Sequence, residues 1–273
     1  MFESKSKALA TVFLNHTLLF FVGVIFFQLQ RDLLVCVLAL IFGVVLDNAI
    51  KWSTRSEFRP NIESLFSAGI TSLSVLILVN TKVTAVYFLV VGVSLVSKYL
   101  IRDEDGHFFN PSLFGLVFAV VFFDLGQLRI QYDQFIGVPH VLYQIGFLGF
   151  LALVPAKRWL LPISFYLPLL AGAWLLSNLG GNSLLELIGP EVSASGLLYI
   201  FFMATDPKTS PENPFHQVLF GAGIALLTLV LAWSQVFHAG LIALFIANYI
   251  TMLHRINNKL GILNIRMGGL RKV

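Results

Sequence analysis

Cysteine is almost absent from this sequence of 273 residues, and charge is sparse. The single cysteine, Cys36, lies within an apolar stretch, which excludes an internal disulfide and a cysteine-ligated cluster. Only 12% of the residues are charged, and the polar connections are short, which excludes an extended soluble domain. His16 stands without a second histidine at metal-ligand spacing, so we expect hydrogen-bonded structure there and no metal site.

Apolar residues are what the sequence has in excess: 57% are hydrophobic and 26 are phenylalanine. This composition indicates a polytopic, all-α integral membrane protein. We count about ten transmembrane segments, several of them short for a bilayer whose hydrocarbon core is about 30 Å thick. They are 9–28, 33–46, 62–79, 83–101, 111–123, 138–154, 159–179, 192–204, 215–233 and 236–252.

The distribution of lysine and arginine predicts the orientation, because these residues gather on the cytoplasmic side of membranes. With ten segments and both termini cytoplasmic, the inner loops and ends hold Lys5, Lys7, Lys51, Arg55, Arg59, Arg102, Lys157, Arg158, Lys208, Arg255, Lys259, Arg266, Arg271 and Lys272. The outer loops hold only Arg31, Lys82 and Arg129. The net charge of +4 therefore reflects topology, and we expect the lipid bilayer, not nucleic acid, as the partner.

Two similar helix starts predict an internal repeat within a single membrane domain, residues 1–273. Pro60-Asn61-Ile62-Glu63-Ser64 opens the third segment much as Pro190-Glu191-Val192-Ser193 opens the eighth. Repeats of five segments, 1–130 and 131–273, would be inverted relative to one another, because five is odd. Inverted repeats with broken helices commonly place a binding site where the halves meet.

Polar side chains within the apolar segments have two interpretations. Four small hydroxyls share one face of the third segment, and we favour close helix packing over a ligand-lined wall. They are Ser64, Ser67, Thr71 and Ser74. Asp47 and Asp124 lie at segment ends, where we expect solvated helix caps.

The first unusual loop contains Asn110-Pro111, which is typical of an N-cap followed by proline at the first helical position. Such a start turns free amide hydrogens toward an electron-rich ligand, although it is also simply a well-capped helix. The second unusual run, 199–214, breaks a short apolar segment into a turn at Thr205-Asp206-Pro207. Its hydroxyls suit either ligand binding or turn chemistry.

Both turns fall on the cytoplasmic side of the predicted topology, so a shared pocket is geometrically plausible. We interpret seven residues around them as candidate cofactor-binding residues; no catalytic residue is assigned. They are Phe109, Asn110, Pro111, Thr205, Asp206, Thr209 and Ser210.

The residues His-Phe-Phe-Asn-Pro-Ser-Leu-Phe-Gly from His107 and Phe-Met-Ala-Thr-Asp-Pro-Lys-Thr-Ser-Pro from Phe202 resemble a known family. This is the RnfD/NqrB family, whose members are membrane components of the Rnf complex and of the sodium-translocating NADH:quinone reductase. The resemblance extends from about Pro60 to Asn248-Tyr249. The Lys208-Thr209-Ser210-Pro211 ending is closer to a stand-alone branch, including members found beside enediyne biosynthesis enzymes.

The resemblance implies a ten-helix, urea-channel-like fold with inverted repeats in a bacterial-type inner membrane. It also implies electron transport through flavins, beside other membrane redox subunits. Family members attach FMN to a threonine in an outer loop, but residues 124–137 contain neither threonine nor serine. Covalent FMN is therefore not expected. The cofactor that the resemblance still implies is a non-covalently bound flavin, either riboflavin or FMN.

Two functions from different classes lead, and a structural partner that anchors other membrane subunits is a third possibility. The first is an electron-transport protein that moves electrons or coupled ions through a bound flavin. The alternative is a small-solute transporter or channel with the same inverted-repeat fold, its path lined by the hydroxyls of the third segment. Flavin absorption of the purified protein would separate the two.

Overall fold

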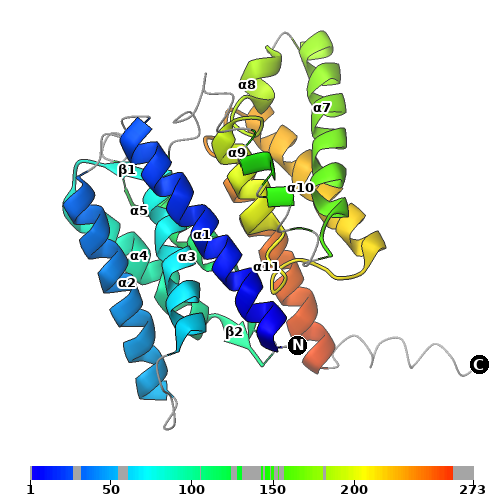
Figure 1. The fold of residues 1–273 in the computed structure, drawn as a ribbon. Helices are drawn as coiled ribbons and strands as arrows, with labels where there is room; N and C mark the ends of the chain where they lie inside the picture. The colour runs from blue at the N-terminus through cyan, green and yellow to red at the C-terminus, as the bar shows by residue number, and fades with distance from the viewer. Residues whose placement is uncertain are drawn as a thin grey trace, which may run out of the picture.

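The computed structural model describes residues 2–26, 32–54, 61–104, 106–123, 128–130, 143, 145–147, 149–150, 153, 157–180 and 183–260. The described part is mainly helical (Figure 1). The N-terminal helices are α1 (Phe2–Phe26), α2 (Leu33–Thr54), α3 (Ile62–Leu78), α4 (Thr84–Leu100) and α5 (Pro111–Phe122). The C-terminal helices are α7 (Leu160–Gly180), α8 (Leu184–Ile188), α9 (Ala194–Leu198), the π-helix η1 (Tyr199–Ala204), α10 (Pro214–Trp233) and α11 (Ala239–Leu260).

The helices form two groups that follow the order of the chain (Figure 1). In the first group α1 and α2 pack on α3, while α4 packs between α2 and α5. In the second group α10 packs on α7 and α11. Contact between α5 and α11 joins the groups, so the end of the first half of the chain lies against the end of the second.

Two short antiparallel strand pairs accompany the helices, and the sequence analysis did not predict them. The strand β1 (Val79–Thr81) pairs with β4 (Leu128–Ile130). The strands β2 (Arg102–Asp103) and β3 (Gly106–His107) form a hairpin directly before α5. Gly106 has φ of 138°, a value that favours glycine, and its N–H donates to the Asp103 carboxylate.

Asparagine caps begin three of the long apolar helices. The Oδ1 atom of Asn61 accepts from the N–H of Ser64 at 2.8 Å, which starts α3 at Ile62, as predicted. Asn213 caps α10, which, like α5, has proline at its first helical position; Oδ1 of Asn213 accepts from the N–H of Phe215. These side chains satisfy amide hydrogens that a helix start leaves without an intrahelical partner.

Most apolar segments match helices within a few residues, but the second and the tenth were predicted too short. We expected them to end at Leu46 and Met252, whereas α2 continues to Thr54 and α11 to Leu260. Asp47 is therefore not a solvated cap; its side chain is fully buried inside the helix. The predicted segment 138–154 lies mostly outside the described residues, as do residue 124 and the loop around it.

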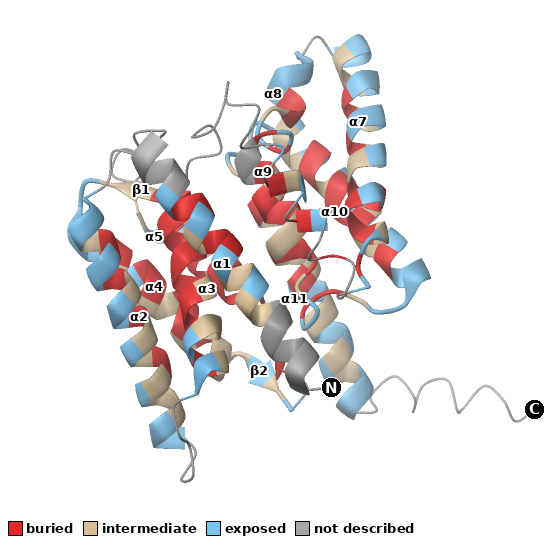
Figure 2. Ribbon diagram, in the orientation of Figure 1, coloured by how far each residue is buried: buried red, intermediate tan, exposed pale blue. Residues whose placement is uncertain are grey.

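Large apolar side chains face outward on both groups of helices (Figure 2). Trp174 and Leu185, for example, are 64% and 75% exposed. Among the described helices, α2, α7, α10 and α11 are long and apolar enough to cross a membrane. Shorter apolar helices occupy α3, α4, α5 and part of α1. Apolar surface on this scale suits lipid, and the chain is a multi-pass helical membrane protein.

Candidate functional site

The loop before α5 forms as predicted. Asn110 is the N-cap and Pro111 the first helical residue; Oδ1 of Asn110 accepts from the N–H of Leu113 at 3.2 Å. The β2–β3 hairpin brings His107 to the same point, three residues before the cap. The loop thus presents an imidazole and a carboxamide together at the start of a short helix.

The second turn follows η1, whose π-helical geometry ends at Ala204. Such helices are rare and often occur at functional sites. The Oδ1 atom of Asp206 accepts from the N–H of Lys208 at 3.0 Å. The main-chain oxygen of Asp206 accepts from the N–H groups of Thr209 and Ser210 at 3.0 and 2.9 Å. The aspartate therefore organises the whole turn.

The two turns meet at Oδ2 of Asp206, the carboxylate oxygen that is not used within its own turn. Its Oδ2 atom lies 3.1 Å from Nδ2 of Asn110 and 3.1 Å from Nε2 of His107. All three side chains are largely enclosed; His107 is 8% exposed and Asp206 15%. Two motifs almost a hundred residues apart in sequence thus form one hydrogen-bonded group.

This group keeps Asp206 ionised. Burial acts to raise the pKa of Asp206, because a carboxylate loses hydration there. The hydrogen bond and charge of His107, followed by the N–H and charge of Lys208, act in the opposite direction and prevail. The pKa of Asp206 consequently lies below its ordinary value of 3.8.

The remaining predicted site residues are buried near this group and bond within the protein. Thr205 Oγ1 donates to the Phe201 carbonyl, and Ser210 Oγ donates to the Asp206 carbonyl at 2.8 Å. Thr209 Oγ1 lies 3.5 Å from the Asp206 carbonyl. Phe109 stacks on Phe245 of α11, with ring centroids 4.7 Å apart. The seven predicted residues thus lie where the two halves of the chain meet.

Two arginines bond to the turns at this meeting point, although the sequence analysis used them only to predict topology. Arg158 is 3% exposed and donates from Nε to Ser210 Oγ at 3.0 Å. Burial is the main influence on the pKa of Arg158 and lowers it, while the charges of Glu212 and Asp206 oppose this effect. Arg158 precedes Ser210 by 52 residues, so spacing along the sequence could not reveal this contact.

The second arginine, Arg255 on α11, connects both turns. Its Nη2 atom donates to the Asp103 carboxylate at 2.6 Å, and its Nη1 atom to the Lys208 carbonyl at 3.3 Å. The guanidinium lies 4.8 Å from the ring centroid of Phe108, a cation–π distance. The C-terminal end of α11 is thereby attached to the hairpin and to the Asp206 turn.

A polar cavity of about 330 Å³ lies beside these turns. It is lined by Leu9, Lys51, Asn61, Glu63, Ser64, Ser67, Lys98, Tyr99, Arg102, Gly106, His107 and Lys208. None of the seven predicted site residues lines it, but His107 does and also contacts Asp206. The sequence analysis missed the cavity because its basic residues were assigned to topology alone.

The buried carboxylate of Asp47 stands behind two lysines of this cavity. Lys51 and Lys98 place Nζ 2.5 and 3.1 Å from its two oxygens, and Tyr99 donates to it at 2.6 Å. The predicted hydroxyl face of α3 is divided: Ser64 and Ser67 accept from these lysines. Thr71 and Ser74 donate to main-chain carbonyls of their own helix instead.

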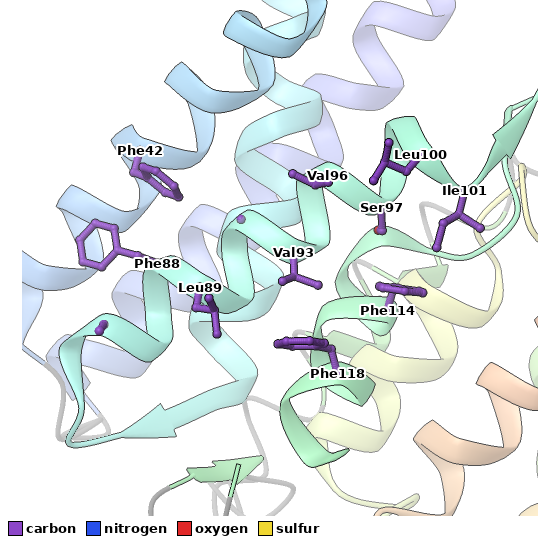
Figure 3. Close-up of a pocket in the computed structure, with 12 residues that line it drawn as sticks. Phe42, Phe88, Leu89, Val93, Val96, Ser97, Leu100, Ile101, Phe114 and Phe118 are labelled. Carbon is purple, nitrogen blue, oxygen red and sulfur yellow. The ribbon is translucent and has the colours of Figure 1, made fainter. Parts of the chain in front are cut away.

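A second cavity of about 680 Å³ is almost entirely apolar and lies between α2, α4 and α5. Figure 3 shows Phe88, Leu89 and Val93 of α4 on one side and Phe114 and Phe118 of α5 on the other. Phe42 of α2 contributes at one end. Among the described residues that line this cavity, Ser97 is the one with a polar side chain, so the cavity suits lipid or another apolar group.

His16 of α1 touches the broken helix without forming a metal site. Its Nδ1 atom lies 2.8 Å from the Val12 carbonyl, and its ring contacts Phe202 edge-on, with centroids 5.0 Å apart. The described residues contain no group of three or more His, Cys, Asp or Glu side chains arranged around a common point. His16 therefore connects α1 with η1 as hydrogen-bonded structure, as the sequence predicted.

The fold and the junction of the two turns define a polytopic helical membrane protein with a broken helix beside a polar cavity. Residues 133–257 match the profile of the NQR2, RnfD, RnfE family. This match over the second half of the chain confirms the resemblance to that family seen in the sequence. The family indicates a membrane subunit of Rnf- or Nqr-type electron-transport complexes. No curated protein matches the chain in a sequence comparison.

Proposed function

We propose that the chain carries electrons within the membrane through a flavin held without a covalent bond beside the Asn110–Asp206 junction. One observation carries the proposal: Asp206 accepts from both Asn110 and His107, and His107 also lines the adjacent polar cavity. A cavity with a few convergent polar groups is the usual setting for a cofactor. The electron-transport family supplies the expected cofactor class.

The seven predicted residues would support the flavin site indirectly, because none of them lines the cavity and His107 connects the cavity with Asp206. Phe109 offers an aromatic face, and Asn110 with Pro111 turns the N-terminus of α5 toward the junction. Thr205, Asp206, Thr209 and Ser210 hold the second turn rigid. These rigid turns would fix the orientation of the flavin ring from behind, while the residues that line the cavity would contact it directly.

A non-covalent mode of binding follows from the sequence of the outer loop. Residues 124–137 contain no hydroxyl side chain other than Tyr132, so a threonyl or seryl phosphoester cannot form there. Riboflavin and FMN both remain candidates, and coupled ion movement would accompany electron transfer as in the family. Other membrane redox subunits would donate and accept the electrons.

The proposed topology places this junction at the cytoplasmic face of a bacterial-type inner membrane. The start of α1 and the end of α11 lie at the same end of the bundle, away from β1 (Figure 1). Lys51, Lys98 and Arg102 surround the cavity at that end. This arrangement agrees with cytoplasmic termini and with the positive-inside rule.

Similar features in the two halves support ten segments in two inverted repeats. Asn61 caps α3, and Ser193 accepts from the N–H of Gly196 at the start of α9, the helix that continues into η1.

Absorption spectroscopy of the detergent-purified protein tests the proposal. We expect flavin bands in the wild type and their loss in Asp206→Ala and Asn110→Ala. Asn213→Ala is the matched control, because Asn213 is also an N-cap before proline but is exposed, and within the described part of the chain it bonds to its own helix start. A correctly folded, colourless wild type would refute flavin binding.

Solute uptake is the alternative, and one observation favours it: Ser64 and Ser67 of the hydroxyl face line the cavity. A colourless protein that carries a small solute into liposomes would identify a transporter or channel. Loss of that uptake in Ser67→Ala, with Thr71→Ala unaffected, would locate the path, because Thr71 bonds back to its own helix.

A further inference from the structure

The β2–β3 hairpin lies between the polar cavity and the C-terminal end of α11, and a charged cluster attaches it to that helix. We propose that Asp103 of β2, together with Arg255 and Lys259 of α11, forms an ionic latch that controls access to the polar cavity. The closed latch holds the hairpin against the cavity, and the open latch lets a small molecule enter or leave. The proposal concerns access alone, so it does not depend on which ligand the cavity holds.

The hairpin turns one face toward the cavity and another toward α11. Arg102 and His107 are partners in the strand register, and both line the cavity. Asp103 is the next residue along β2, and its carboxylate bonds to α11 instead. A strand imposes this alternation, because successive side chains point to opposite faces. The charge that holds the hairpin is therefore separate from the side chains of β2 and β3 that line the cavity.

Two cations of α11 meet the carboxylate of Asp103. Nη2 of Arg255 donates to Oδ1 at 2.6 Å, and Nζ of Lys259 lies 3.1 Å from Oδ2. Residues four apart on a helix share one face, so both side chains reach the same acid. Asp103 thus connects the hairpin of the first half of the chain to the last helix of the second half.

Arg255 also reaches the second turn that borders the cavity. Its Nη1 atom donates to the carbonyl of Lys208 at 3.3 Å, and Lys208 lines the cavity. Its guanidinium lies 4.8 Å from the ring centroid of Phe108, directly after the hairpin. A planar guanidinium binds acceptors on two loops at once through its fixed fork of donors, which the compact ammonium group of lysine does not reproduce. Release of this one side chain would loosen both turns together.

The latch is in contact with water, so ions in solution act on it. The side chains of Arg255 and Lys259 are 21% and 43% exposed, and that of Asp103 is 14% exposed. Partly exposed ion pairs contribute little net free energy, and salt screens them. A closed state held by such contacts lies close in free energy to an open one, so a small change in the contacts shifts the population.

The test measures how fast N-ethylmaleimide reacts with a cysteine placed in the cavity of the full-length protein in detergent. Ser67→Cys supplies this reporter, because Ser67 lines the cavity, and Cys36→Ala removes the native cysteine. Ser53→Cys, at an exposed position near the end of α2, is a second reporter outside the cavity lining. When the hairpin closes faster than the reagent reacts, the labelling rate follows the population of the open state.

Opening the latch should speed labelling at the cavity reporter alone. We expect Asp103→Asn to raise the rate at Ser67→Cys about fivefold. Arg255→Gln should raise it by at least as much, because the arginine also bonds to the second turn. Arg255→Lys keeps the charge but not the fork, so it should also label faster than the reporter background. Glu104→Gln is the matched control, since it removes an exposed acid beside Asp103 and should change nothing.

Two further arms separate an ionic latch from a hairpin that is merely loosened. Potassium chloride should speed labelling of the reporter background, because salt screens the ion pair, and should act much less in Asp103→Asn. The double variant with Asp103→Asn and Arg255→Gln should label at most about twofold faster than Arg255→Gln, because both changes break one contact. Should Ser67→Cys fail to fold by circular dichroism, Glu63→Cys, at another lining position, takes its place.

Three results would overturn the proposal. The first is equal labelling of the cavity reporter with and without Asp103→Asn in folded protein. The second is the same acceleration at Ser53→Cys or in Glu104→Gln, which would show general loosening. The third is labelling of the cavity reporter that salt does not change. The labelling needs no flavin, and flavin absorption is recorded on protein without reporters, so either proposal can fail without the other.

Discussion

The Nδ2 atom of Asn110 lies 3.1 Å from Oδ2 of Asp206, although 96 positions separate the two residues. Asn110 begins α5, and Asp206 follows the π-helix η1, so the contact joins a helix start in the first half to a helix end in the second. The carboxylate also lies near the positive end of α5, where a negative charge is stabilised. The junction is therefore both a cap and a link between the halves.

Asn110→Ala should destabilise the protein more than Asn213→Ala. Both variants lose an N-cap, which costs about 0.5 to 2 kcal/mol. Asn110→Ala also removes a donor to an ionised carboxylate, a hydrogen bond contributing about 1.5 to 3 kcal/mol. Thermal unfolding in one detergent, followed by circular dichroism, measures the difference. Equal losses in the two variants would show that the bond to Asp206 contributes little.

Acid should weaken the wild type more than Asp206→Asn. The pKa of Asp206 is lower in the folded protein than its ordinary value of 3.8. Its contribution to the free energy of unfolding is therefore complete above 3.8 and is lost as the pH falls through the lower folded value. Asn keeps the shape but cannot titrate, so that variant should lack this part of the decline.

Unfolding temperatures measured at falling pH provide the comparison. Glu104→Gln is the control, since Glu104 is an exposed acid of the same hairpin region and should leave the acid response as in wild type. Parallel curves for wild type and Asp206→Asn would contradict the assignment of the low pKa to this carboxylate.

Local features of the fold were predictable from the sequence, and the cavity was not. The Asn110-Pro111 start and the Asn61 start follow from neighbours three residues away, which a sequence displays directly. The meeting of Asn110 with Asp206 was expected only as plausible, because it depended on topology. The structure places them in direct hydrogen-bond contact.

Asp47 shows why the rest escaped prediction. Its polar neighbours on α2 looked like a segment end, whereas two of its partners, Lys98 and Tyr99, come from α4, more than fifty residues later. The pairing of Val79 with Ile130 in the β1–β4 ladder is similarly distant. Contacts of this kind arise from packing, and neither hydrophobic periodicity nor local spacing encodes them.

Two glycines on α10 should respond in opposite ways to alanine. A Cβ atom added at Gly221 would lie 2.1 Å from Ser164 Oγ and 2.8 Å from the Leu161 main-chain oxygen, so α10 and α7 would have to separate. We expect Gly221→Ala to cost about 1 to 3 kcal/mol. At Gly223 a Cβ meets nothing within 4 Å, and alanine should stabilise the helix by about 0.5 to 1 kcal/mol.

The measurement is the unfolding temperature of the two variants in one detergent. Because both variants make the same substitution on the same helix, the gain in helix propensity largely cancels between them. If Gly221→Ala proved as stable as Gly223→Ala, the close approach of α10 to α7 would be wrong.

Glu191 should make the protein less stable as the pH rises from about 4.5 to about 7. It lies in the turn between α8 and α9 and is 3% exposed. Burial raises its pKa to about 7, although its own N–H and that of Gly240 oppose this effect. The unfolded chain therefore releases this proton first, and stability is lost until the folded carboxyl also ionises.

The whole effect amounts to about 3 kcal/mol, an order-of-magnitude figure from the difference between the ordinary and the folded pKa. Glu191→Gln resembles the protonated acid and still accepts from Gly240, so it should lack this decline and exceed the wild type in stability at pH 8. Unfolding temperatures between pH 4.5 and 8 provide the check. A wild type and a Gln variant that respond alike would mean that Glu191 titrates at its ordinary value.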